Sequence, residues 1–197
     1  MKPGQFYLKL RNSRYSPLVD FALFAIITVF LHFFYWNFLG FFRESKFFIT
    51  ISGFMADQVF AGAMWINSHL FNYGITANYS TNTLVINGSD YITVNEGCSG
   101  FKQDYQLLFL FLLYPGIWKH KLWYIPFSFI IMHLTNIFRI VVLTAVLNMQ
   151  PQYWDFWHEW IMRPFYYVVI FFLWVLWNEK FRAKVRRLRG PALIAER

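Results

Sequence analysis

The chain has 197 residues, of which 57% are hydrophobic and only 14% are charged, against roughly 25% charged in a typical soluble domain. A water-soluble domain of this length cannot bury an aromatic share of 23%, whereas lipid accepts it and Trp and Tyr favour the membrane interface. The composition excludes a soluble globular protein and indicates a single integral membrane domain over residues 1–197, and the net charge of +8 has to be interpreted in that setting.

Basic residues gather at both ends of the chain. Four precede the first apolar run and six follow the last one: Lys2, Lys9, Arg11, Arg14, Lys180, Arg182, Lys184, Arg186, Arg187 and Arg189. Such juxtamembrane clusters fix orientation and contact anionic lipid. We therefore expect both termini in the cytoplasm, a basic cytoplasmic tail over 180–197, anionic lipid as a partner of both ends, and no binding of nucleic acid.

Four apolar runs come near or above the ~20 residues that cross a bilayer and are predicted to span it: 17–42, 101–118, 122–148 and 160–178. The first is too long for a signal peptide and is expected to be a retained anchor. A further run, 47–66, is apolar on average but contains two glycines, Asp57 and Gln58. With both termini inside, the orientations agree only if 47–66 does not cross, so we expect an interfacial or re-entrant helix on the outer side.

Residues 79–97 form the predicted outer loop. In it the β-branched runs 83–86 and 91–94 flank Asn87-Gly88, which is a strong hairpin signal. The expected fold class is thus an all-α membrane bundle of about four spans plus an interfacial or re-entrant helix, with a small extracytoplasmic β-hairpin.

The one cysteine, Cys98, follows this hairpin in the sequence Glu96-Gly97-Cys98-Ser99-Gly100, where a polar loop enters a predicted span. A thiol is a strong nucleophile where water reaches it and nearly inert inside hydrocarbon, and flanking glycines allow another chain to approach closely. Taken alone, a lone cysteine is more often an inert packing residue. The rest of the chain has to decide between these interpretations.

Two further residues are predicted to reach the level of Cys98. Arg139 lies 17 residues beyond the start of the 122–148 run, so it has risen roughly 25 Å, and His158 lies in the next outer loop. A charge inside a membrane is costly and suggests function, although Arg139 as a snorkelling anchor is the alternative. For His158, an interfacial-belt role among Trp154, Trp157 and Trp160 is the alternative.

Together these residue types suit acyl transfer. A thiolate, favoured by a neighbouring cation, is the nucleophile; histidine serves as base and then acid; and arginine, always protonated, can hold an oxyanion. Asn136, on the face of Arg139, is expected to orient it or bind substrate backbone. Glu96 and Ser99 are the other expected supporting residues. No two histidines have metal-ligand spacing, so neither a metal nor another cofactor is expected.

In their order and spacing, Glu96-Gly97-Cys98-Ser99-Gly100, Asn136-Ile137-Phe138-Arg139 and the downstream His158 resemble the motifs of the exosortase/archaeosortase membrane proteins, over about 95–160. The resemblance implies a cysteine peptidase or transpeptidase of the cytoplasmic (inner) membrane, with an extracytoplasmic active site formed by Cys98, Arg139 and His158. It further implies that the substrates are exported, membrane-anchored proteins whose C-terminal sorting signal (a short motif, a helix and a basic tail) is cleaved through a thioester. The acceptor is unknown.

Two other interpretations stay open. Gly97-Cys98-Ser99-Gly100 also matches the Gly-x-Ser-Gly motif of rhomboid-type intramembrane serine proteases, in which Ser99 would attack. That interpretation leaves Arg139 unexplained, and rhomboids have more helices. The non-enzymatic alternative is a membrane assembly or transport subunit with a structural polar cluster. The scarcity of intramembrane charges other than Arg139 argues against a transport pathway.

Overall fold

The computed structural model describes residues 16–71, 74–86, 88, 90–114 and 116–182. The basic residues before position 16 and the predicted tail beyond 182 lie outside this part. The described chain is mostly helical with one small antiparallel sheet, which confirms the predicted fold class.

The longest helices are α2 (Ser16–Asn37), α4 (Lys46–Ile66), α6 (Trp118–Met149) and α8 (Arg163–Trp177). Shorter α-helices and single turns of tighter or wider helix connect them: α3 (Gly40–Arg43), η1 (Asn67–Phe71), η2 (Glu96–Cys98), α5 (Phe101–Leu113), η3 (Pro151–Tyr153), α7 (Trp154–Phe156), η4 (Trp157–Met162) and η5 (Asn178–Arg182). Four helical stretches are long and apolar enough to cross a membrane: Pro17–Asn37, Lys46–Phe71, Trp118–Met149 and Pro151–Lys180.

The boundaries of the first and the last two stretches differ from the predicted 17–42, 122–148 and 160–178 by several residues, and two further differences are larger. Helix α5 has only 13 residues and ends at Leu113, well before the predicted boundary of 101–118. Tyr114 leaves the helix with extended backbone angles because Pro115 follows it in the sequence, and a residue before proline avoids the helical region. The second difference is that α4 with η1 meets the length and hydropathy of a span, so the interfacial or re-entrant placement of 47–66 stays a prediction.

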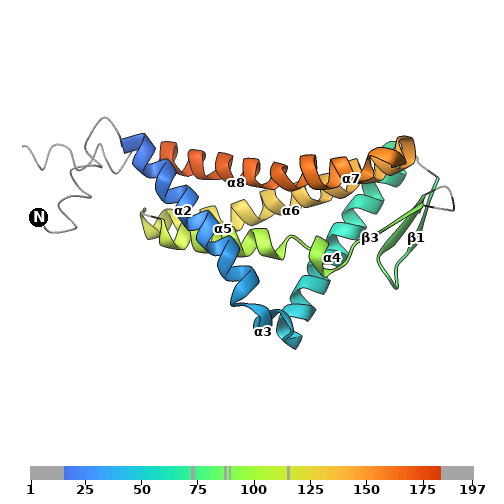
Figure 1. Cartoon of the computed structure of the whole chain (residues 1–197), viewed down its shortest axis with the longest axis horizontal. Helices are drawn as coiled ribbons and strands as arrows, with labels where there is room; N and C mark the ends of the chain where they lie inside the picture. Colours follow the sequence, from blue (N-terminus) through green and yellow to red (C-terminus); the bar gives the residue numbers. More distant parts are fainter. Residues whose placement is uncertain (1–15, 72–73, 87, 89, 115, 183–197) are drawn as a thin grey trace, which may run out of the picture.

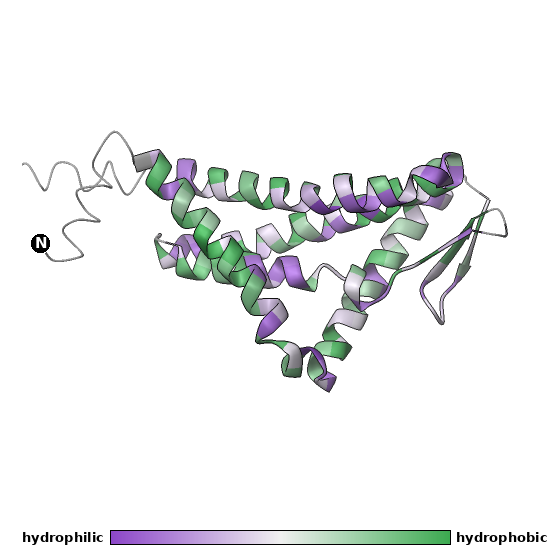
Figure 2. Cartoon of the chain, in the orientation of Figure 1, coloured by the Kyte–Doolittle hydropathy of each residue, from purple (hydrophilic) through white to green (hydrophobic). Residues whose placement is uncertain are grey.

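The helices α5, α6 and α8 run along the long axis of the molecule, and α2 descends obliquely toward α3 (Figure 1). From there α4 rises to the end that carries the sheet (Figure 1). Many large side chains of α2 are exposed, including Phe21, Ile26, Phe30 and Phe33. Figure 2 shows this helix hydrophobic along much of its length. An apolar helix with so little of its surface covered by protein is what a lipid-facing helix requires.

Two buried clusters hold the fold together. One joins α5, α6 and α8 through Phe111, Tyr124, Ile170 and Trp177. The other joins α4, the sheet and the later part of α6 through residues such as Phe60, Leu84 and Leu143. The second cluster fixes the sheet against the helices, and Cys98 packs at its margin.

The sheet has three antiparallel strands in the order β1 (Ile75–Asn78), β2 (Thr83–Ile86) and β3 (Asp90–Thr93). The predicted hairpin is confirmed as β2–β3, with Thr83 opposite Thr93 and Gly88 at a φ of +78° in the connection. Glycine suits this position because other residues rarely adopt positive φ. Strand β1 was not predicted.

Candidate functional site

Cys98 lies in a tight turn between β3 and α5. Asn95 starts this turn. Its side-chain Oδ1 accepts from the backbone N–H of Gly97 at 3.0 Å, and its backbone carbonyl accepts from the N–H of Cys98 at 2.8 Å. Gly100 then takes a φ of +86°, and a Cβ on it would lie 3.1 Å from Nδ2 of Asn136. A glycine is needed there for both reasons, so the turn is built to bring the cysteine close to α6.

Ser99 has a structural environment that Cys98 lacks. Its side chain is only 2% exposed, and its Oγ accepts from the backbone N–H of Phe101 at 3.2 Å, at the start of α5. Cys98 is a free thiol and only partly buried. Of the two candidate nucleophiles, Cys98 is thus the more accessible.

Asn136 connects the cysteine turn to the helices. It is fully buried on α6, and its Nδ2 donates to the carbonyl oxygen of Cys98 at 2.6 Å. Its Oδ1 accepts from the hydroxyl of Tyr166 on α8. Both ends of the amide are thus hydrogen-bonded, as buried polar groups usually are. These bonds connect the cysteine turn, α6 and α8.

Arg139 points into the bundle rather than toward lipid. Arg139 is only 7% exposed. Its Nη2 donates to Nε2 of His158 at 2.8 Å, and its Nη1 lies 3.5 Å from the hydroxyl of Tyr166. The guanidinium carbon also lies 5.6 Å from the centre of the Tyr166 ring. This position does not fit the snorkelling alternative, in which the charge leaves the bundle for the interface.

His158 lies in η4, where its ring stacks on Trp154 with 7° between the planes. Its Nδ1 is 3.1 Å from Oε1 of Glu159, which also forms an ion pair with Arg163. Because a guanidinium can only donate, Nε2 of His158 is the acceptor in the contact with Arg139. The proton of a neutral imidazole is then on Nδ1, where it donates to the carboxylate of Glu159.

The predicted residues therefore converge to different degrees. Arg139 and His158 touch directly, and Asn136 bonds to the backbone of Cys98. Glu96 is exposed on the cysteine turn, where it faces a cleft beside α4. Within the described residues no group of three or more His, Cys, Asp or Glu side chains is placed to hold a metal ion.

Comparison with known families matches the chain to the family described as transmembrane exosortase over residues 18–176. The chain belongs to this family. The matched region contains every predicted site residue and extends well beyond the 95–160 stretch that carries the resemblance in sequence. No curated protein and no solved structure matches the chain. Membership makes it a multi-pass, sortase-like membrane protein.

In this member of the exosortase family the structure adds a residue that the sequence did not single out, Tyr166. Its hydroxyl joins Asn136 and Arg139, it is 3% exposed, and it lies within electrostatic range of Cys98 and Asp104. A buried tyrosine hydroxyl needs a hydrogen-bond partner, so a tyrosine in a predicted span is the signal that the sequence offers. In so aromatic a chain that signal is weak.

Asp104 is the second such residue. It lies one turn into α5, and its Oδ1 is buried without a hydrogen-bond partner among the described residues. A buried carboxylate oxygen left unpaired is costly. Asp104 interacts electrostatically with Tyr166, one member of the polar network.

Proposed function

We propose that this exosortase-family protein is a cysteine peptidase or transpeptidase that cleaves C-terminal sorting signals of exported, membrane-anchored proteins. The observation that carries the proposal is the partly buried contact between Arg139 and His158, which Tyr166 and Asn136 join to the turn of Cys98. A cation, an imidazole and a free thiol from three segments are the groups that acyl transfer through sulfur requires.

In the first step His158 takes the proton of the Cys98 thiol, and the sulfur attacks the carbonyl carbon of the substrate peptide bond. The electron pair of the C=O bond moves to oxygen, where Arg139 donates hydrogen bonds to the oxyanion. His158 then gives its proton to the amine nitrogen as the C–N bond breaks. The leaving amine departs and a thioester remains on Cys98.

This sequence requires Arg139 to change partner. Its Nη2 donates to Nε2 of His158, the nitrogen that would take the thiol proton. In the proposed cycle the guanidinium turns from His158 to the substrate oxygen, which frees Nε2 as a base. Glu159 continues to accept from Nδ1 and keeps the ring in the required tautomer.

In the second step an acceptor attacks the thioester, His158 takes a proton from it, and the C–S bond breaks to return the thiolate. An amine acceptor gives transpeptidation and water gives hydrolysis. Both fall within the proposal, and the mass of the new substrate C-terminus distinguishes them.

The proposed location is the extracytoplasmic face of the cytoplasmic membrane, with both termini in the cytoplasm. The basic residues at the two ends of the chain support this orientation and suggest anionic lipid as their partner.

The proposal is tested by co-expressing the chain with an exported protein that ends in a short motif, an apolar helix and a basic tail. We expect Cys98→Ala to abolish processing of that protein on a gel, Cys98→Ser to retain little, and Ser99→Ala to retain much of it. Normal processing by Cys98→Ala together with loss in Ser99→Ala would replace the proposal with the rhomboid-like mechanism.

A further inference from the structure

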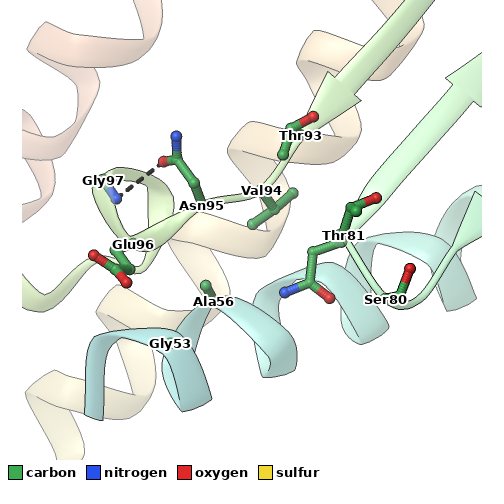
Figure 3. Close-up of a pocket in the computed structure, with 10 residues that line it drawn as sticks. Gly53, Ala56, Ser80, Thr81, Thr93, Val94, Asn95, Glu96 and Gly97 are labelled. Atoms are coloured by element: carbon green, nitrogen blue, oxygen red, sulfur yellow. Dashed lines mark hydrogen bonds between the residues drawn. The ribbon is translucent and has the colours of Figure 1, made fainter. Parts of the chain in front are cut away.

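A cleft of about 450 Å³ lies beside the cysteine turn, between α4, the 80–82 turn that connects β1 to β2, and the 93–97 segment that leaves β3 (Figure 3). Its size is that of a small-ligand or short-peptide site. We call it the 53–97 cleft. Gly53 and Ala56 of α4 form its floor.

Hydrogen bonds hold both walls of the cleft in place. The N–H of Val94 donates to the carbonyl of Asn82 at 2.9 Å, which joins the 93–97 segment to the 80–82 turn at one end of the cleft. The side chain of Asn82 donates to Asp57 of α4 at 2.6 Å, which ties the 80–82 turn to the floor. The cleft is therefore formed before any ligand arrives, and binding to such a site loses little ordering entropy.

The lining of the cleft is suited to a peptide. Hydroxyl, amide and carboxylate groups of Ser80, Thr81, Thr93, Asn95 and Glu96 line it. The hydroxyls of Ser80, Thr81 and Thr93 already bond to neighbouring side chains, and Oδ1 of Asn95 accepts from the N–H of Gly97. The hydroxyl oxygens keep a further lone pair, the Asn95 amide keeps its N–H groups and Glu96 offers its carboxylate, so an extended peptide backbone finds both donors and acceptors here. A Cβ built on Gly53 meets nothing within 4 Å, so an incoming backbone can approach α4 closely.

The cleft also leads to the proposed nucleophile. Asn95, Glu96 and Gly97 line it, and they are the three residues before Cys98 in one continuous turn. In Figure 3 their side of the cleft lies next to the floor formed by α4. A peptide lying along the 93–97 segment therefore meets the cysteine turn at its end.

We propose that the 53–97 cleft binds the extended polar segment of the protein substrate that immediately precedes the peptide bond attacked by Cys98. The assignment to the N-terminal side of that bond follows because the cleft adjoins the sheet, while the apolar helix after the bond belongs with the membrane helices. This inference rests on the proposed function, since the position of the attacked bond is defined by Cys98.

The test uses the detergent-solubilised full chain and a pool of N-acetyl-tripeptidyl chloromethyl ketones built from Ser, Thr, Asn, Gln and Gly. The sulfur of Cys98 displaces chloride from the reagent, and because the chain has a single cysteine each adduct is assigned by mass. Iodoacetamide, which carries no peptide, measures the accessibility of the thiol alone. The variant is Gly53→Leu, whose side chain enters the cleft. The matched control is Gly40→Leu in α3, where an added Cβ also meets nothing within 4 Å and which does not line the cleft.

We expect Gly53→Leu to slow alkylation by the peptide pool by about tenfold or more while leaving the iodoacetamide rate unchanged. Gly40→Leu should leave both rates unchanged, and a retained iodoacetamide rate shows that the variant is folded around its thiol. Equal rates of peptide alkylation in Gly53→Leu and the unmodified chain would overturn the cleft assignment and leave the proposed function intact.

If neither reagent alkylates Cys98 in the unmodified chain, the nucleophile assignment fails instead. In that case the cleft assignment is tested by measuring, with fluorescence anisotropy, the binding of fluorescein-labelled tripeptide amides of the same composition. Binding that is lost in Gly53→Leu and kept in Gly40→Leu supports the cleft, and equal binding by all three proteins, or none by the unmodified chain, overturns it.

Discussion

The guanidinium of Arg139 donates to Nε2 of His158 at 2.8 Å inside the helical bundle. Among the described residues Arg139 forms no ion pair with a carboxylate, and its Nε has no hydrogen-bond partner. A buried cation held mainly by a neutral imidazole and a tyrosine is an expensive arrangement in a membrane protein. Such an arrangement is expected if the guanidinium donates hydrogen bonds to a substrate oxygen during the reaction.

If Arg139 stabilises developing charge, then Arg139→Lys should be nearly as damaging as Arg139→Ala. A point ammonium cannot reproduce the planar fork that contacts both His158 and Tyr166. The loss of one oxyanion donor typically costs ~10²–10³ in rate. The rate of substrate processing measures this effect, with Arg163→Lys as the control, because Arg163 is exposed and its ion pair with Glu159 is of a kind that contributes little. Processing by Arg139→Lys within a few fold of normal would remove the oxyanion role.

His158→Ala should reduce processing about as strongly as the loss of Arg139, because it removes both the base and the acid of the proposed cycle. His133 is a useful comparison, since it lies on α6 and takes no part in the contacts of the site. We therefore expect His133→Ala to be much milder in the same processing assay. Equal effects of the two substitutions would indicate a general loss of folding rather than a role for His158.

Tyr166→Phe tests whether the polar network holds the site together. The change removes one hydroxyl and leaves the buried Oδ1 of Asn136 without its donor, which typically costs about 1–3 kcal/mol. We expect a lower midpoint of thermal unfolding in detergent and slower processing. Tyr167→Phe is the matched control, because its hydroxyl contacts His32 at 3.0 Å, away from the cysteine turn. A Tyr166→Phe protein with normal stability and activity would show that the network is dispensable.

The predicted topology places both termini inside and residues 67–97 outside. Reporter fusions after Lys46, after Asn95, after His120 and at the C-terminus should report outside, outside, inside and inside. The fusion after Asn95 also decides how α4 lies, since a crossing α4 would bring the sheet into the cytoplasm. A cytoplasmic signal there would contradict the topology and the extracytoplasmic site together.

The sequence predicts the membrane class and the β2–β3 hairpin because composition and an Asn-Gly turn are local signals. It missed β1, which is four residues long and whose only β-branched residues are Ile75 and Thr76. The length of α5 was overestimated because hydropathy continues through Tyr114, whereas the backbone leaves the helix before Pro115. For α5 a local backbone constraint thus outweighed the apolar pattern, whereas β1 has too weak a local signal.

For the site, sequence order and spacing predicted Cys98, Asn136, Arg139 and His158 at one level, and the structure gives contacts between Arg139 and His158 and between Asn136 and the backbone of Cys98. Tyr166 could not be found in this way, because one tyrosine in an aromatic helix has no distinguishing pattern. The cleft beside α4 was equally hidden, since it depends on how the 80–82 turn packs against α4.

The central claim is that Cys98 carries the substrate as a thioester, and capture of that intermediate tests it most directly. Protein purified under acidic denaturing conditions from cells that co-express a substrate is digested and analysed by mass spectrometry, with and without hydroxylamine. The account predicts a hydroxylamine-sensitive adduct on Cys98 whose added mass is that of the new C-terminal peptide of the substrate less one water, and no such adduct in Cys98→Ala. An acyl adduct on Ser99, or continued substrate cleavage by Cys98→Ala, would contradict it.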